Sequence, residues 1–236
     1  MTPAARARAL VARTLAAHPG RVALACSFGG PAGMVLLDLV ARLDRSVPVY
    51  YLDTGLLFPE TYELVERASR RYGIVPQAVR PRLSLGAQAA LHGQALWERD
   101  PDRCCALRKV EPNRAFVAGY AAWLTGIRRA QTVQRADVVP VADEDGVRKI
   151  SPLHDWSDAE VWAYVNAHDV PVNALHADGY PSIGCVPCTQ RPLDPADPRS
   201  GRWAGFGKTE CGLHLPPAAA APAGEAVSAS AAGAAS

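Results

Sequence analysis

The sequence predicts an α/β fold in which a twisted parallel sheet carries helices on both faces. Short apolar runs of strand type alternate with helical segments, and glycine-containing turns follow the strands. The 236 residues, 49% hydrophobic and 20% charged, suffice for one well-buried core. We therefore expect one α/β domain over residues 1–198, a mobile segment over 199–215, and a disordered tail over 216–236, where Ala, Pro, Gly and Ser predominate.

The first elements follow from local signals. Thr2 and Pro3 form an N-cap and a first helical turn. Further along, glycine-rich residues 27–33 separate an apolar run from a buried helix. The expected elements are helices at 3–18, 34–43 and 59–72 and strands at 22–26, 49–52 and 75–79. This alternation places ligand chemistry at the carboxyl ends of the strands.

The second half of the chain is less regular. An apolar run at 123–125 precedes Gly126, Ile127 and two arginines, which predicts a strand end and another loop that faces phosphate. The capping box of Ser157 and Glu160 opens a helix through residue 166. Proline and glycine make residues 170–198 a predicted loop.

Charge and hydropathy exclude two classes of partner. The balance of 25 basic against 23 acidic residues gives a net charge of +2, which argues against sequence-independent nucleic-acid binding. No apolar run approaches the roughly 20 residues that a bilayer span needs. The apolar run near the N-terminus is also too short for a signal peptide, so a cytoplasmic protein with no membrane partner is expected.

The glycine-rich turn is a candidate phosphate loop. Ser27, Phe28 and Gly29 open it, and backbone N–H groups at the start of the following helix can face an anion. An ordinary turn explains its spacing equally well, because it matches neither common nucleotide fingerprint. Asp53, at the next strand end, either accepts from a ribose hydroxyl or caps the turn.

The cysteines point to a metal centre. Cys104, Cys105, Cys185 and Cys188 form two close pairs and can supply four thiolates to zinc or to an iron–sulfur cluster. The vicinal pair favours iron and sulfide over zinc. Lys109 lies four residues after Cys105, on the same face if Cys105 opens a helix.

Cys211 stands apart from the other cysteines and is a candidate nucleophile. Lys208 and His214 flank it, an electropositive setting that favours thiolate, although Glu210 opposes it. Gly212 suggests a mobile, accessible position, and a surface cysteine without a role is the alternative. Arg199 and Arg202 precede it and can neutralise an anion. Cys26, by contrast, lies at the end of a buried strand and is expected to be a core residue.

Five motifs make the chain resemble the adenylyl-sulfate reductases of bacterial sulfate assimilation, members of the adenine nucleotide α-hydrolase-like group. They are YLDTGLLFPET at 51–61, DRCCALRKVEP at 102–112, TGIRR at 125–129, GYPSIGCVPC at 179–188 and KTECGLH at 208–214. The resemblance implies that the four paired cysteines hold a [4Fe-4S] cluster. In that family this set marks enzymes that use adenosine 5'-phosphosulfate, whereas relatives without it generally use the 3'-phosphorylated nucleotide.

The same resemblance implies a reaction and its residues. Cys211 would attack the sulfur of the phosphosulfate, and thioredoxin or a similar dithiol would release sulfite. The substrate contacts expected at matching positions or flanking them are Ser27, Phe28, Gly29, Asp53, Lys109, Arg128, Arg199, Arg202 and His214. Residues 29–32 depart from the family's loop, which commonly reads SFGAE, because they lack its acidic residue. Nothing after His214 is expected to fold as a thioredoxin-like domain, so the reductant is external.

Several alternatives stay open at this point. A 3'-phosphoadenylyl-sulfate reductase is the nearest, and an ATP pyrophosphatase or tRNA thiolase would need an acidic residue that the loop lacks. A non-catalytic iron–sulfur or zinc protein that senses redox state is a third, although it leaves Cys211 unexplained. The sequence does not indicate the oligomeric state, and a homo-oligomer stays open.

Overall fold

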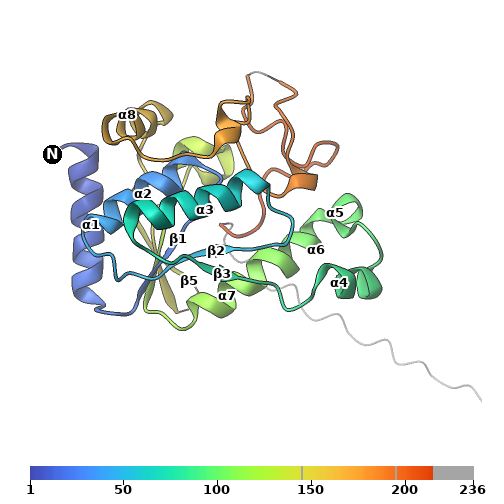
Figure 1. Ribbon diagram of the computed structural model, residues 1–236, viewed down its shortest axis with the longest axis horizontal. Helices are drawn as coiled ribbons and strands as arrows, with labels where there is room; N and C mark the ends of the chain where they lie inside the picture. Colours follow the sequence, from blue (N-terminus) through green and yellow to red (C-terminus); the bar gives the residue numbers. More distant parts are fainter. Residues whose placement is uncertain (145, 195, 215–236) are drawn as a thin grey trace, which may run out of the picture.

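A six-stranded sheet organises the chain, as seen in the computed structural model (Figure 1). The structure describes residues 1–144, 146–194 and 196–214, so the predicted disordered tail lies outside the described residues. The strand order is β3-β2-β1-β4-β6-β5. The strands are β1 (Val22–Ala25), β2 (Val49–Leu52), β3 (Gln77–Val79), β4 (Ala122–Thr125), β5 (Val141–Glu144) and β6 (Val147–Ile150).

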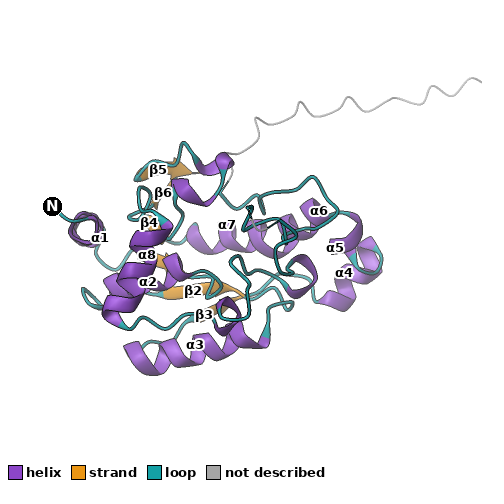
Figure 2. Cartoon of the chain, turned by 90° about the horizontal axis from the view of Figure 1, so that it is seen from above, coloured by secondary structure: helices purple, strands orange, loops and turns teal. Residues whose placement is uncertain are grey.

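Helices cover both faces of this sheet, as the sequence predicts. One face packs in a core with α1, α2, α3 and α8, while Phe116 and Val117 of α7 pack on the other with Trp123. In both views α1 and the α4–α6 group lie at opposite ends of the molecule (Figures 1 and 2). The helices are α1 (Pro3–Ala17), α2 (Pro31–Ala41), α3 (Pro59–Tyr72), α4 (Leu85–His92), α5 (Leu96–Arg99), α6 (Pro101–Cys105), α7 (Glu111–Val117) and α8 (Asp158–His168).

The sheet is parallel except at one edge. β5 pairs antiparallel with β6, so the sheet is mixed rather than wholly parallel. These two strands follow one another across residues 145–146, and a connection this short can only join antiparallel strands. An Asp-Gly pair at that place in the sequence is a strong hairpin signal.

Local signals set most of the helix starts. Thr2 accepts a hydrogen bond from the Ala5 N–H at the start of α1, and Ser157 and Glu160 form the predicted capping box of α8. α2 begins at Pro31, three residues before the predicted start, because Gly30 takes the N-cap position. Residues 170–198 are mostly loop but contain the 3-10 turns Ala174–His176 and Val186–Cys188.

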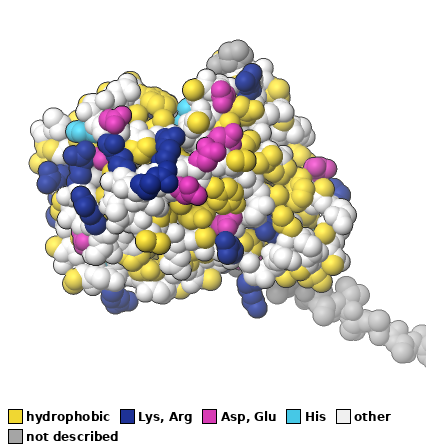
Figure 3. Space-filling view, in the orientation of Figure 1, with side chains coloured by type: hydrophobic (Ala, Val, Ile, Leu, Met, Phe, Trp, Pro, Cys, Tyr) yellow, Lys and Arg dark blue, Asp and Glu magenta, His cyan; other side chains and the backbone are white. Residues whose placement is uncertain are grey.

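Charged side chains are unevenly spread over the surface. On the face shown in Figure 3, most Lys and Arg side chains lie over the half that α1, α2, α3 and α8 form. Among the described residues, no helix is both long and apolar enough to cross a bilayer.

Candidate active site

A cavity of about 1070 Å³ lies at the carboxyl ends of β1, β2 and β4. The chain runs from β1 to β2 and β3 on one side, and then continues with β4 on the other side of β1. The loops after β1 and β4 therefore diverge and leave a crevice, which is where open α/β sheets bind ligands. The cavity lies where the strand alternation predicts ligand chemistry.

The candidate phosphate loop forms one wall of this cavity. Ser27, Gly29 and the first turn of α2 line it, and no side chain caps that helix. Its free N–H groups can therefore bind an anion. Asn173 donates to the Phe28 carbonyl at 3.0 Å, and His176 Nε2 lies 3.0 Å from the Gly29 carbonyl, so the predicted loop at 170–198 supports the turn from behind.

Two of the predicted substrate contacts lie elsewhere. The Phe28 side chain is fully buried in the core and packs edge-on against Tyr51. The Asp53 carboxylate accepts from Tyr62 at 2.7 Å and from Arg80 at 3.0 Å. It also accepts from the N–H of Gly55, the turn-capping role that the sequence left open. Neither side chain lines the cavity.

The four paired cysteines lie together beside the cavity. All are buried and free, and Cys105, Cys185 and Cys188 pack with the ring of Trp203. Burial raises the pKa of the Cys105 thiol to about 12 and that of Cys188 to about 11, although the charge of Lys109 lowers both. Cys26, in the β1 core, has a pKa raised to about 12 by burial, in agreement with the predicted core role.

Four cysteine thiols are a donor set that both iron–sulfur clusters and structural zinc use. Among the residues described, no group of three or more His, Cys, Asp or Glu side chains is arranged to hold one metal ion. In a [4Fe-4S] cluster each cysteine binds a different iron, so the sulfurs surround a volume instead of converging on a point. The four thiols are buried and free, cations lie nearby, and metal binding would displace their protons.

Lys109 lies between the cysteines and the cavity. Cys105 ends α6 rather than opening a helix, and a π-helical turn (Ala106–Val110) follows it. Burial would lower the pKa of the Lys109 ammonium, yet the sulfurs of Cys185, Cys211 and Cys105 raise it overall. The lysine is therefore a fixed positive charge next to Cys211.

Arg199 and Arg202 extend this positive wall. Arg202 lies over the Trp203 ring at 4.5 Å and donates to the Cys188 carbonyl at 3.0 Å. Its guanidinium passes so close to Gly184 that a Cβ there would meet it at 2.1 Å, so a side chain at this position would displace the arginine. Burial lowers the pKa of Arg199 to about 10, which still leaves it charged near neutral pH.

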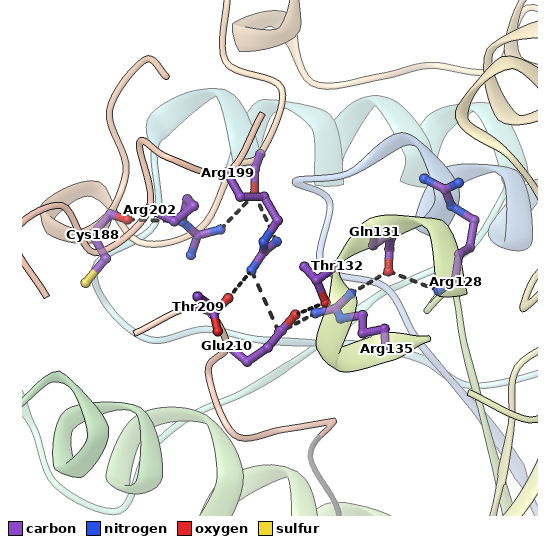
Figure 4. Close-up of polar contacts among 10 residues, drawn as sticks. Arg128, Gln131, Thr132, Arg135, Cys188, Arg199, Arg202, Thr209 and Glu210 are labelled. Carbon is purple, nitrogen blue, oxygen red and sulfur yellow. Dashed lines mark hydrogen bonds and ion pairs between the residues drawn. The ribbon is translucent and has the colours of Figure 1, made fainter. Parts of the chain in front are cut away.

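A polar network joins the loop after β4 to the C-terminal segment (Figure 4). Arg128 donates to the Trp156 carbonyl at 2.9 Å and pairs with Asp158. Arg135 pairs with Glu210 at 2.6 Å. The Nε atoms of Arg128, Arg135 and Arg199 are buried and lack a hydrogen-bond partner in the described part of the chain. Several cations along one cavity give it a positive lining that favours an anionic ligand.

Cys211 reaches the same cavity but is half-buried rather than exposed. It packs against the cysteine group, and Gly212 continues the chain at a φ of +83°, which favours glycine. His214 then stacks on Trp123 with ring centroids 6.0 Å apart. Burial, with the charges of Lys149, Arg135 and Arg199, lowers the pKa of His214, so its ring is neutral at neutral pH.

Most of the predicted site is therefore brought to one place. Of the predicted substrate contacts, the cavity-lining ones are Ser27, Gly29, Lys109, Arg128, Arg199, Arg202 and His214. Sequence reasoning missed Arg135, which lines the same cavity as Trp203. Trp203 follows Arg202 directly, but Arg135 lies in a 3-10 turn that carries no motif.

Comparison with known proteins adds three findings. Residues 21–191 match the family model described as phosphoadenosine phosphosulfate reductase domain. The chain is 48% identical to the adenosine 5'-phosphosulfate reductase of Geobacillus thermodenitrificans, over 82% of this chain and 83% of that protein. It is 49% identical to the reductase of the same name in Salinibacter ruber, over 80% of this chain and 76% of that protein.

A solved structure is similar as well. It is the phosphoadenylyl-sulfate reductase of Candida auris in a phosphate complex, with a TM-score of 0.66 and 32% identity. The match covers 80% of this chain and 91% of that one.

Proposed function

Because the chain belongs to the phosphoadenosine phosphosulfate reductase domain family, we propose that it reduces adenosine 5'-phosphosulfate to sulfite and AMP in sulfate assimilation. One observation carries the proposal. The Cys211 thiol lies in a cavity walled by five cations, and three of these cations have buried donors without a partner. The cations are Lys109, Arg128, Arg135, Arg199 and Arg202.

In the first step the Cys211 thiolate attacks the sulfur of the phosphosulfate. A sulfur–sulfur bond forms, the bond from sulfur to the bridging oxygen breaks, and AMP leaves with that electron pair. Two anions must approach each other in this step. Lys109 and Arg202, next to Cys211, provide the fixed positive charge that lowers the cost of their approach.

In the second step a thiolate of an external dithiol, such as thioredoxin, attacks the sulfur of Cys211. Sulfite leaves and a mixed disulfide forms, which the second thiol of the reductant resolves. The reductant is thereby oxidised to its disulfide, and Cys211 returns as a thiol. This external dithiol and a cytoplasmic location are part of the proposal.

We also propose that Cys104, Cys105, Cys185 and Cys188 hold a [4Fe-4S] cluster. When bound, such a cluster cross-links the α6 end to the 185–188 turn and places charge beside Lys109. The Thr54 hydroxyl lies 3.3 Å from the Cys185 sulfur and supports its orientation.

Sulfite release from anaerobically purified protein tests this function. With thioredoxin as reductant, we expect kcat/KM for adenosine 5'-phosphosulfate to exceed that for the 3'-phosphorylated nucleotide by about 100-fold, roughly 2.7 kcal/mol. The extra phosphate needs its own cations near the ribose, and Pro31 and Ala32 in the loop provide none. Equal efficiencies would contradict this choice of substrate.

A further inference from the structure

A buried carboxylate lies one residue before the proposed nucleophile. Glu210 is only 5% exposed. Its Oε2 accepts from Arg135 at 2.6 Å, and its Oε1 accepts from the Thr132 hydroxyl at 2.9 Å. Figure 4 shows the carboxylate reaching from the C-terminal segment to the turn that carries both partners. The side chain thus ties residue 210 to the loop after β4.

The backbone of the same segment is held from the opposite wall. Arg199 donates to the Thr209 carbonyl at 2.8 Å, and its guanidinium lies 3.7 Å from the Glu210 carboxylate. The two residues before Cys211 are therefore held between the loop after β4 and the loop after the 185–188 turn (Figure 4). Such two-sided contact restricts where the thiol can lie.

Substrate binding does not explain this carboxylate. A glutamate in a cavity that binds a phosphosulfate repels this anion. It also forms ion pairs with two of the cations that would otherwise bind the anion. Burial raises its pKa, but the hydrogen bond and charge of Arg135, with the charge of Arg199, lower it overall, so it stays ionised. A buried charge of this kind needs a structural reason.

We propose that Glu210 is a positioning residue that holds the segment 208–214 closed, with Cys211 facing Lys109 and Arg202. The effect of Glu210 on turnover rests on the proposed function, whereas its effect on the position of Cys211 does not. Without the carboxylate, the segment loses its attachment to Thr132 and Arg135 and opens, which exposes the thiol. The contact geometry itself holds whatever the substrate is.

Alkylation of Cys211 tests the attachment independently of catalysis. The full chain, purified without oxygen, is treated with N-ethylmaleimide, and the peptide that contains Cys211 is quantified by mass spectrometry over time. Glu210→Ala should accelerate labelling about tenfold, because it removes a hydrogen bond to a charged group. The matched control is Glu66→Ala, an exposed carboxylate on α3, which should label at the wild-type rate.

A second variant separates opening from a change in thiol reactivity. Thr132→Val removes one hydrogen bond to Glu210 without changing any charge, and Thr132 does not line the cavity. It should accelerate labelling about threefold. In the Glu210→Ala background it should add nothing, because its partner is already gone. It also keeps the test decisive if Glu210→Ala fails to fold.

Turnover provides the catalytic readout. Glu210→Ala should lower kcat about tenfold and change the Kd for AMP less than twofold, because the loss lies in placing the thiol rather than in binding the nucleotide. Unchanged labelling in both variants, or additive effects in the double variant, would overturn the proposal. Absence of sulfite release by the wild-type protein would instead count against the proposed function and leave the labelling result intact.

Discussion

Lys109→Met isolates the contribution of one fixed cation to the attack by Cys211. Methionine keeps an unbranched side chain of similar reach but carries no charge. The lysine is half-buried, and the neighbouring sulfurs outweigh the effect of burial on its pKa, which indicates close charge contacts. Two unit charges about 4 Å apart interact by about 4 kcal/mol in surroundings of intermediate polarity.

The other cations of the cavity remain in this variant and compensate for part of the lost charge. We therefore expect kcat/KM for sulfite release to fall about 100- to 1000-fold, the range found when one preorganised donor is removed from a transition state. AMP binding, followed by calorimetry, should change far less, because AMP lacks the sulfonate. The visible absorption of the proposed cluster checks that the centre is intact.

Arg103→Met is the matched control for this prediction. Arg103 lies on α6, pairs with the half-exposed Glu111 at 3.8 Å and does not line the cavity. Its replacement removes a cation of the same helical region without touching the site. A loss of AMP affinity as large as the loss of kcat/KM, or equal activity of Lys109→Met and wild type, would refute the assigned role.

Three further predictions use other readouts. Cys211→Ser should bind AMP but release no sulfite, and wild-type protein given substrate without reductant should carry a sulfonate on the Cys211 peptide; the adduct on another cysteine would contradict the mechanism. Iron and acid-labile sulfide should both be about four per chain, and serine at any of the four paired cysteines should remove the colour while Cys26→Ser keeps it. Burial lowers the pKa of His176, so the unfolded chain binds more protons below the ordinary value of 6.5, and the free energy of unfolding should fall as pH drops through that value. His176→Gln should flatten this dependence in urea titrations between pH 7.5 and about 5.5.

Local sequence signals predicted many of the regular elements. β2 and α3 have the predicted bounds, and α1, β1 and α8 agree within one or two residues. Each depends on caps, prolines or apolar runs that act over a few residues. The helices α4–α7 and the β5–β6 hairpin were missed, although Ser84, Asp100 and the Asp-Gly pair at 145–146 are signals for α4, α6 and the hairpin.

The sequence by itself identified the candidate residues of the site. Residue types and spacing singled out the four paired cysteines, Cys211 and Lys109, whereas the arginines at 199 and 202 gained weight only from the resemblance to the adenylyl-sulfate reductases. Their roles as ligands, nucleophile and substrate contacts stay predictions.

Only the tertiary structure decided which of these groups meet. The Asp53 carboxylate accepts from Tyr62 and Arg80 instead of lining the cavity. Arg135 lines the cavity and pairs with Glu210, 75 residues further along the chain. Such pairings depend on which strands lie side by side and on how the loops that follow them pack, and both are set by the sheet order. Local sequence signals do not carry them, because a contact between distant residues is stabilised only after the fold has brought them together.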